Sequence, residues 1–321
     1  MVKKAELHVH LEGTATPELV RELSGRNGAT IDPATFGPDG DFAWGTFLEF
    51  LTAYDRAAAV ILTKDDYRRV TYDYLRRCAE EEAIYVEMFS SPDHAAAVGM
   101  SYTDHLDGIA AGIEEAKADF GIEGRIIVTC VRHLGPERAE AVARQVVAHP
   151  HPLVVGFGMG GDEGAFEAAD FAPAFTHVHQ SGLAITSHAG EFGGPTSIRD
   201  TLLHLPVQRL GHGVRVIEDE SLLQEIASRK IPLELCPGSN VATGLFDNRS
   251  AHPFKNLMEQ GCVVTLNSDD PPFFKTSIGR EYDAAAQHYG LDEAALTQIT
   301  RNAIAAAFCD DALKEELSSR L

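Results

Sequence analysis

The chain of 321 residues carries 48 acidic and 27 basic side chains, so its formal net charge at pH 7 is −21. This acidic balance, without any cluster of Lys and Arg, excludes proteins that bind nucleic acid or an acidic membrane surface through basic side chains. No apolar run approaches the roughly 18 residues of a membrane span, and the five cysteines are scattered without a Cys-x-x-Cys pair. We therefore expect a cytoplasmic protein without a signal peptide, a membrane anchor or a disulfide framework.

Short apolar, β-branched segments alternate with helical patterns along the whole chain. Eight segments are predicted to be strands, namely Ala5–His8, Ile84–Phe89, Gly124–Val131, Leu153–Phe157, Leu183–Ser187, Val207–Leu210, Ile231–Leu235 and Cys262–Leu266. Strands that alternate with helices pair in parallel, and eight such units at this length predict a (β/α)8 barrel of the TIM type. Because no linker or charge run divides the chain, residues 1–321 are expected to form a single domain.

Helix start and stop signals support this alternation. Thr103 is the expected N-cap of a helix whose apolar residues follow the helical spacing, and Gly121 stands just beyond its end. Asp219 and Asp292 are expected to cap two later helices in the same way.

The first unit is longer than one crossover helix requires. Within it we expect helices over Trp44–Tyr54 and Asp65–Glu81. Extra helices after the first strand of a barrel lie at its catalytic end, so they could form a lid over the site or only pad the barrel. The sequence leaves both interpretations open.

Residues that ligate metals follow the predicted strands. His8 and His10 are separated by one residue and therefore point to the same face of the first strand, while His188 follows the fifth strand and Asp269 the eighth. Each of these motifs alone is weak, but active sites in barrels form at the C-terminal ends of the strands, where all four would meet. Imidazole and carboxylate ligands favour zinc. No lysine that could bridge two ions follows the third or fourth strand, so we expect one Zn²⁺ per subunit.

Three further polar residues follow the same strand ends. Glu191 lies three residues beyond His188 and could protonate a ring nitrogen of a substrate. His212 follows the sixth strand and Asp270 follows Asp269. Both could therefore hold a water molecule that is bound to the zinc ion and attacks the substrate. The simpler alternatives are that Glu191 is an acidic residue in the first turn of a helix and that Asp270 caps a turn.

A glycine-rich run at residues 156–161 matches the pattern G-x-G-x-x-G of dinucleotide-binding proteins. It lies in the middle of the chain, and the next strand ends in His188 rather than in an acid that could bind a ribose. We therefore interpret it as a glycine-rich turn that lets a small flat ligand approach the backbone, and not as an NAD site.

Taken together, these motifs resemble those of the adenosine deaminase family, within the amidohydrolase superfamily. The matching stretches occur in family order and are Leu7–Gly13, Gly160–Glu163, His188–Glu191, Arg209–Val214, Cys236–Asn240 and Asn267–Pro271. The resemblance implies a zinc-dependent hydrolase that replaces the 6-amino group of a purine by oxygen and releases ammonia.

The resemblance also implies roles for particular residues. The zinc ligands would be His8, His10, His188 and Asp269. Glu191 would protonate the purine N1, while His212 and Asp270 would orient or deprotonate the zinc-bound water. Gly161 would offer a backbone contact to the purine, Glu12 would lie where the family contacts the sugar, and Asp270 would also contact the substrate.

The sequence departs from the family pattern in ways that bear on the substrate. Gly158 stands where adenosine deaminases usually carry Asp, and Glu12 replaces the common sugar-side Asp, as in relatives that act on free adenine. Residues 267–270 also resemble those of the family members that act on adenine. Residues 160–163 and 210–213 instead resemble those of the members that act on adenosine. We expect adenosine or 2′-deoxyadenosine, converted to inosine or 2′-deoxyinosine, with adenine and aminodeoxyfutalosine as alternatives.

Two hypotheses of other classes remain at this point. One is a metal-dependent amide or ester hydrolase on the same barrel, and the other is a purine-binding protein with a structural zinc. Zinc deaminases of the cytidine type are excluded because their His-x-Glu and Pro-Cys-x-x-Cys motifs are absent. The expected partner is a small purine, and the sequence predicts nothing about the oligomeric state.

Overall fold

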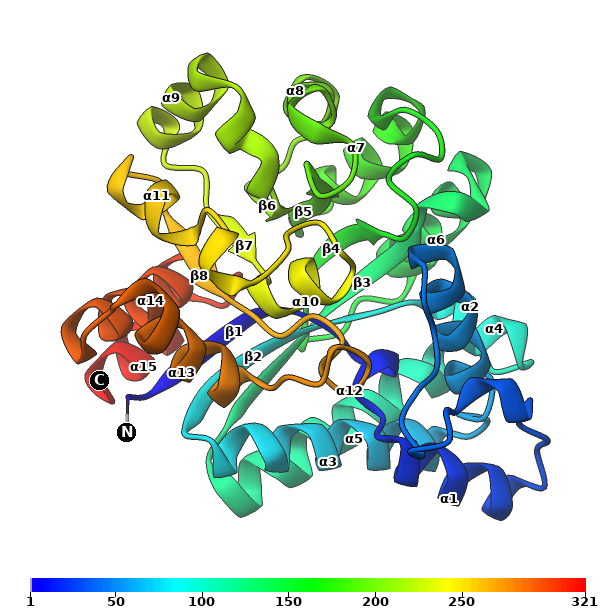
Figure 1. The fold of residues 1–321 in the computed structure, drawn as a ribbon. Helices are drawn as coiled ribbons and strands as arrows, with labels where there is room; N and C mark the ends of the chain where they lie inside the picture. The colour runs from blue at the N-terminus through cyan, green and yellow to red at the C-terminus, as the bar shows by residue number, and fades with distance from the viewer. Residues whose placement is uncertain (1) are drawn as a thin grey trace.

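A computed structural model describes residues 2–321 and contains one eight-stranded sheet in the order β1 to β8, with every neighbouring pair parallel. The strands are β1 (Lys4–His10), β2 (Ala83–Ser90), β3 (Glu123–Val131), β4 (Val154–Gly160), β5 (Ala184–Ala189), β6 (Arg209–His212), β7 (Leu233–Leu235) and β8 (Val264–Leu266). A bridge between Val9 and Asp269 joins β1 to the segment after β8, so the sheet nearly closes (Figure 1). The predicted (β/α)8 barrel of the TIM type is confirmed.

Helices pack around this barrel, and some of them lie over the ends of its strands (Figure 1). They are α1 (Pro17–Asn27), α2 (Phe47–Ala58), α3 (Lys64–Glu80), α4 (Pro92–Ala97), α5 (Tyr102–Phe120), α6 (Pro136–Ala148), α7 (Ala172–Gln180), α8 (Gly194–His204), α9 (Glu220–Arg229), α10 (Pro237–Ala242), α11 (Phe254–Glu259), α12 (Pro271–Phe274), α13 (Ile278–Tyr289), α14 (Glu293–Ala306) and α15 (Asp311–Ser319). Among residues 2–321, none of the helices combines the length and apolar character that crossing a membrane requires.

The helix caps follow the sequence signals with one exception. The side chains of Asp219 and Asp292 accept hydrogen bonds from backbone N–H groups in the first turns of α9 and α14, as expected, and Gly121 ends α5 with φ of +68°. The prediction of Thr103 as a cap was wrong. Ser101 caps α5 instead, because its extended backbone lets Oγ accept the N–H of Asp104 at 3.1 Å, whereas Thr103 already lies inside the helix.

The extra helices after β1 have unequal roles. Both predicted segments are helical, although α2 begins three residues later than expected because Thr46 and Glu49 form a capping box there. Residues of α2 line the main pocket of the barrel, namely Phe47, Phe50, Leu51, Tyr54 and Asp55. Helix α2 therefore covers the pocket, whereas α3 packs against α5 and β2 on the outside of the barrel.

The glycine-rich run belongs mainly to β4, so its interpretation as a turn was wrong. Gly158 pairs with Thr129 and Gly160 with Val131 in the β3–β4 ladder, and only Gly161 has the left-handed backbone of a turn, with φ of +98°. These glycines make room for neighbouring rings. A Cβ added at Gly158 would lie 3.0 Å from the ring of Phe89.

The interior of the barrel contains a buried charged cluster beneath the pocket. Arg209 on β6 donates from Nη2 to Glu87 on β2 and from Nε to Glu234 on β7, each at 2.6 Å. Its third nitrogen, Nη1, donates to the carbonyl of Ala306 at 2.8 Å, and its guanidinium carbon lies 3.5 Å from the ring centroid of Phe308. This arginine thus neutralises both carboxylates and joins three parts of the barrel.

Candidate active site

Four metal-ligating side chains meet at the C-terminal end of the barrel. Nε2 of His188 lies 3.1 Å from Nε2 of both His8 and His10, and Oδ1 of Asp269 lies 3.4 Å from Nε2 of His10 and 3.7 Å from that of His8. All four donor atoms fall within 4.8 Å of one another. Tetrahedral ligands at zinc bond lengths are separated by about 3.3 Å, so this donor set fits one zinc ion.

The histidines of this cluster are held in the form that binds metal. Burial and the neighbouring imidazoles lower the pKa of His8 and His10 well below the usual value, and burial lowers that of His188 to about 4. Neutral imidazole is the ligand form, so binding of an ion requires no loss of protons from these rings near pH 7. Asp269 adopts a left-handed backbone with φ of +65°, a strained conformation that is typical of functional sites.

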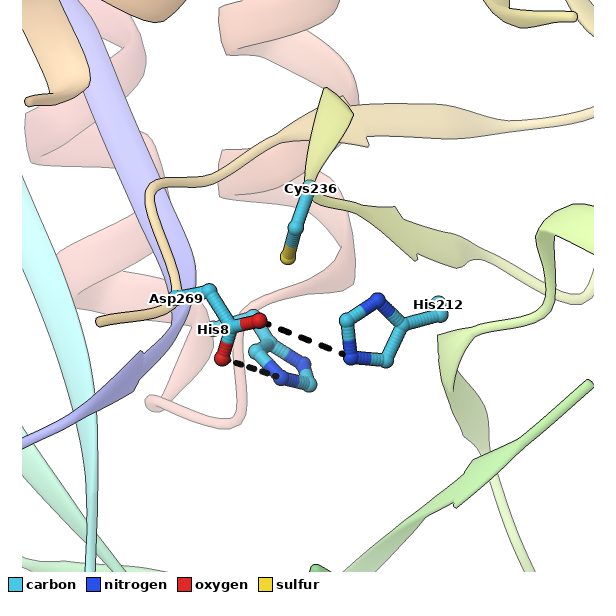
Figure 2. Close-up of side chains that lie close together, drawn as sticks. All are labelled: His8, His212, Cys236 and Asp269. Atoms are coloured by element: carbon cyan, nitrogen blue, oxygen red, sulfur yellow. Dashed lines mark ion pairs between the residues drawn. The ribbon is translucent and has the colours of Figure 1, made fainter. Parts of the chain in front are cut away.

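A second donor set overlaps with the first and consists of His8, His212, Cys236 and Asp269 (Figure 2). Nδ1 of His8 is occupied by Glu234 at 2.8 Å, so only its Nε2 is free for a metal. Because one nitrogen cannot ligate two ions, the two sets cannot be filled together. Burial also raises the pKa of the Cys236 thiol well above its usual range, which disfavours the thiolate. The set with three histidines is therefore the better metal site.

Glu234 is a functional residue that the sequence reasoning missed. Its carboxylate accepts from Nδ1 of His8 at 2.8 Å, from the hydroxyl of Thr186 at 3.0 Å and from Arg209. Such a partner fixes the ring orientation of a metal-binding histidine and directs its other nitrogen toward the ion. The available signal was that Glu234 is a charged residue within the otherwise apolar predicted strand Ile231–Leu235.

Glu191 and His212 lie beside the donor set. Oε2 of Glu191 is 3.6 Å from Nε2 of His212, whose Nε2 is 3.8 Å from Oδ2 of Asp269. Burial, together with the charges of Asp269 and Glu163, raises the pKa of Glu191 well above its usual range. The carboxyl group therefore stays protonated at higher pH than an exposed glutamate, as a general acid requires.

The loop that carries Glu191 is anchored by Glu163, which the sequence reasoning named only within a motif. Its carboxylate accepts the backbone N–H groups of Glu191 at 3.0 Å, Phe192 at 2.6 Å and Gly193 at 2.8 Å. It also accepts from the N–H of Gly190 and from the hydroxyl of Ser197. One buried carboxylate thus fixes the whole turn between β5 and α8.

Glu12 and Asp270 form the acidic side of the pocket. Oε1 of Glu12 accepts from Ser90 at 2.6 Å and from Tyr67 at 3.3 Å, while Oε2 accepts from Tyr54 at 3.1 Å. Although burial opposes ionisation, hydrogen bonds and nearby histidines lower the pKa of Glu12 to about 2. Burial and the adjacent Asp269 raise the pKa of Asp270 well above its usual range, and its Oδ1 has no hydrogen-bond partner among the described residues.

All the site residues expected from the sequence are brought to this end of the barrel. The pocket is lined by His10, Glu12, Gly161, His188, Glu191, His212, Asp269 and Asp270, together with residues of α2 and the ends of β3 and β4. His8 lies behind them and completes the donor set. The arrangement places an acid, two further polar side chains and a metal donor set around one covered cavity, which suits hydrolysis of a small polar substrate.

Gly160→Ala is expected to weaken zinc binding. A Cβ at this position would lie 3.1 Å from Cε1 of His10 and 3.2 Å from Cε1 of His188, so both ligand rings must shift. Disturbing the surroundings of ligands typically costs about 10–100-fold in metal affinity, which competition with a chelator measures. In the control Gly156→Ala, at the other end of β4, the Cβ presses on Phe308 instead. Equal zinc affinity in the two variants would contradict this prediction.

Glu163→Gln is expected to lower kcat about 10- to 100-fold, because small misplacements of an acid are costly. The glutamine side chain has only one acceptor oxygen, and its NH₂ group faces backbone N–H groups that are also donors. The turn that carries Glu191 must therefore shift. Steady-state kinetics of ammonia release measure this, with the exposed Glu140→Gln as the matched control. An unchanged kcat in Glu163→Gln would show that the anchor does not position the acid.

The fold and the donor set define this chain as a hydrolase of the metal-dependent amidohydrolase class. The family model described as adenosine deaminase matches residues 3–321, so the chain belongs to the adenosine deaminase family. It is a deaminase that hydrolyses C–N bonds.

Relatives within this family are named adenine deaminases. The protein of Chelativorans sp. (strain BNC1) is 49% identical, covering 100% of this chain and 98% of its own length. The protein of Mesorhizobium japonicum is 47% identical with the same coverage. These relatives do not support the expectation of adenosine as substrate, whereas they support the adenine alternative.

Solved structures agree in fold. The adenine deaminase from Arthrobacter aurescens has a TM-score of 0.91 at 28% identity, covering 99% of this chain and 98% of that one. An amidohydrolase from Burkholderia ambifaria, solved with bound Zn, has a TM-score of 0.89 at 28% identity, covering 99% and 89%. The N6-methyl-AMP deaminase from Arabidopsis thaliana, at 24% identity, shares the fold with a TM-score of 0.86 over 99% and 96%.

Proposed function

We propose that this protein is an adenine deaminase, which hydrolyses free adenine to hypoxanthine and ammonia. The names of its relatives support this substrate class. The observation in this chain that carries the proposal is the hydrogen-bonding state of Glu12.

Glu12 suits a free base better than a nucleoside. A carboxylate offers about four acceptor positions, and the hydroxyls of Ser90, Tyr67 and Tyr54 fill three of them, which leaves one on Oε2. Free adenine presents one N–H at its imidazole edge, where a nucleoside carries a bulky sugar with several hydroxyls. The single remaining acceptor therefore matches adenine.

We propose one zinc ion per subunit, held by His8, His10, His188 and Asp269. The donor set fits zinc in its distances and in its neutral imidazoles, and a related amidohydrolase binds Zn. When bound, zinc supplies a water molecule whose pKa is lowered to about 7, so that hydroxide is available at neutral pH.

The chain's own residues would perform the remaining steps. Glu191, protonated because its pKa is raised, would donate its proton to N1 of the purine as water attacks C6, which prevents negative charge from building up in the ring. His212 and Asp270 would orient the attacking water or take its proton. That proton would pass to the amino group on C6, which then leaves as ammonia when the C–N bond breaks. Gly161 and Asp270 line the pocket and would contact the purine together with Glu12.

We also propose that the chain acts as a single catalytic domain in the cytoplasm, with a small purine as its partner. The five cysteines are all free and buried, which supports a reducing compartment.

Methylation of the substrate tests the contact at Glu12. We expect the zinc-loaded protein to release ammonia from adenine at a kcat/KM at least about 10²-fold above that for 9-methyladenine, because a site built to bind an N–H rejects an analogue without it. 1-Deazaadenine, which lacks N1, is the second probe and should not be turned over. Equal rates for adenine and 9-methyladenine would contradict a hydrogen bond from the N–H of free adenine to Glu12.

A further inference from the structure

A chain of buried hydrogen bonds leads from the backbone of α11 to His212. His252 accepts the backbone N–H of Phe254 at its Nδ1, with a distance of 3.2 Å. Nε2 of His252 lies 3.2 Å from Oδ1 of Asn240. Nδ2 of Asn240 lies 3.3 Å from Nδ1 of His212 and 3.5 Å from Oε1 of Glu191.

Which group donates in each of these hydrogen bonds follows from the first bond, between Phe254 and His252. A backbone N–H can only donate, so Nδ1 of His252 is an acceptor and carries no proton. A neutral imidazole then carries its proton on Nε2, which must donate to the carbonyl oxygen of Asn240. Burial, with the nearby charge of Arg249, lowers the pKa of His252 to about 3 and keeps this ring neutral.

The same logic fixes the Asn240 side chain. If the amide were flipped, its NH₂ group would face the N–H of His252, and two buried donors would oppose each other. The NH₂ group therefore points toward the catalytic side, with one hydrogen for His212 and one for Glu191. Asn240 and His252 are both buried, so water does not compete for these bonds.

We propose that Asn240 and His252 are positioning residues that fix neutral His212 as the tautomer with its proton on Nε2. Nδ1 of His212 accepts from Asn240, and Nε2, which faces Glu191 and Asp269, carries the proton. His212 thus meets the attacking water as a hydrogen-bond donor and orients it. Under the proposed function, on which this inference rests, neutral His212 is therefore not the group that takes the water's proton.

Asn240→Asp reverses the hydrogen bond to His212 without changing the shape of the side chain. One oxygen of a carboxylate at this position accepts from Nε2 of His252. The other oxygen can form a hydrogen bond with His212 only if Nδ1 of His212 carries a proton, because a carboxylate has no hydrogen to donate. We expect this variant to convert His212 to the Nδ1–H tautomer and to lower kcat for adenine by at least about 10²-fold, with a smaller change in KM.

The tautomer is read directly from long-range ¹H–¹⁵N correlation spectra of the folded protein labelled with ¹⁵N-histidine. The signal of His212 is assigned by its loss in His212→Gln. Asn302→Asp is the matched control, because Asn302 also donates its amide to a buried group, the carbonyl of Val264, but lies outside the pocket. This control should keep both the Nε2–H tautomer of His212 and the wild-type kcat.

Two outcomes would overturn the inference. One is an Nδ1–H tautomer of His212 in the wild-type protein, and the other is an unchanged tautomer in Asn240→Asp. His252→Phe gives an independent check, because removal of the donor frees the Asn240 amide to turn and should produce a mixture of His212 tautomers. The spectra require no substrate, so the inference can fail or hold separately from the choice of adenine.

Discussion

Glu191→Gln is expected to lower kcat for adenine by at least about 10²-fold, since general acid catalysis typically contributes 10²–10⁴ in rate. Glutamine has the same shape and can keep the contact with Asn240, but it has no acidic proton to give to N1. Circular dichroism and zinc content should match the wild type. The measurement is the initial rate of ammonia release at saturating adenine.

The pH profile gives a second readout of the same acid. Because the pKa of Glu191 is raised, wild-type kcat should fall only as the pH rises through that value and the acid loses its proton. This limb should be absent in Glu191→Gln. The exposed Glu80→Gln serves as a control with wild-type kinetics. Near-full activity of Glu191→Gln would contradict the assignment of the acid.

Arg209→Met is expected to lower the free energy of unfolding by about 3–5 kcal/mol, the range for breaking a buried ion pair on one side. The substitution leaves Glu87 and Glu234 buried without a positive partner. Urea unfolding monitored by circular dichroism measures the change. Because Glu234 also holds His8, the affinity for zinc should fall in the same variant.

Neutralising the two carboxylates separates the charge effect from packing. The triple variant Arg209→Met, Glu87→Gln and Glu234→Gln should regain part of the lost stability, since it leaves no unpaired buried charge. Arg199→Met, which breaks an exposed pair with Asp219, should change stability by less than about 1 kcal/mol. A similarly small effect in Arg209→Met would show that the buried cluster contributes little.

The barrel and the metal donor set could be predicted because both depend on local patterns. β-Branched runs mark the strands, and a parallel barrel brings all strand ends to one face. His8 and His10 lie at the end of β1, His188 lies at the end of β5, and Asp269 lies three residues beyond β8, so topology alone makes them converge. Helix caps such as Asp219 are equally local, while Thr103 failed because Ser101, two residues earlier, offers the same chemistry.

The residues that support the site could not be predicted, because their function depends on contacts between distant parts of the chain. Glu234 acts on His8, which is 226 positions away in the sequence. Glu163 acts on a turn beyond the next helix, and Asn240 and His252 act through hydrogen-bond directions that only the fold defines. No spacing rule connects such residues.

The relatives support the adenine alternative rather than the expected adenosine, and Gly158 is one departure from the adenosine pattern whose physical cause lies in the fold. Gly158 was weighed as a departure from the adenosine pattern without knowledge of its surroundings. Gly158 lies in β4, where an added Cβ would be 3.0 Å from the ring of Phe89. Phe89 in turn packs against His8 and His10. An aspartate would not fit there without displacing a ring that supports the metal ligands. The absence of Asp is thus built into the packing of this site.

The most direct test of the account is the substrate preference of the zinc-loaded protein. Ammonia release should be measured for adenine, adenosine, 2′-deoxyadenosine and aminodeoxyfutalosine, with hypoxanthine quantified as the product from adenine. The kcat/KM for adenine is expected to be at least about 10²-fold above that for each of the other three, because only the free base offers an N–H to Glu12. Equal or greater turnover of any of them would contradict it.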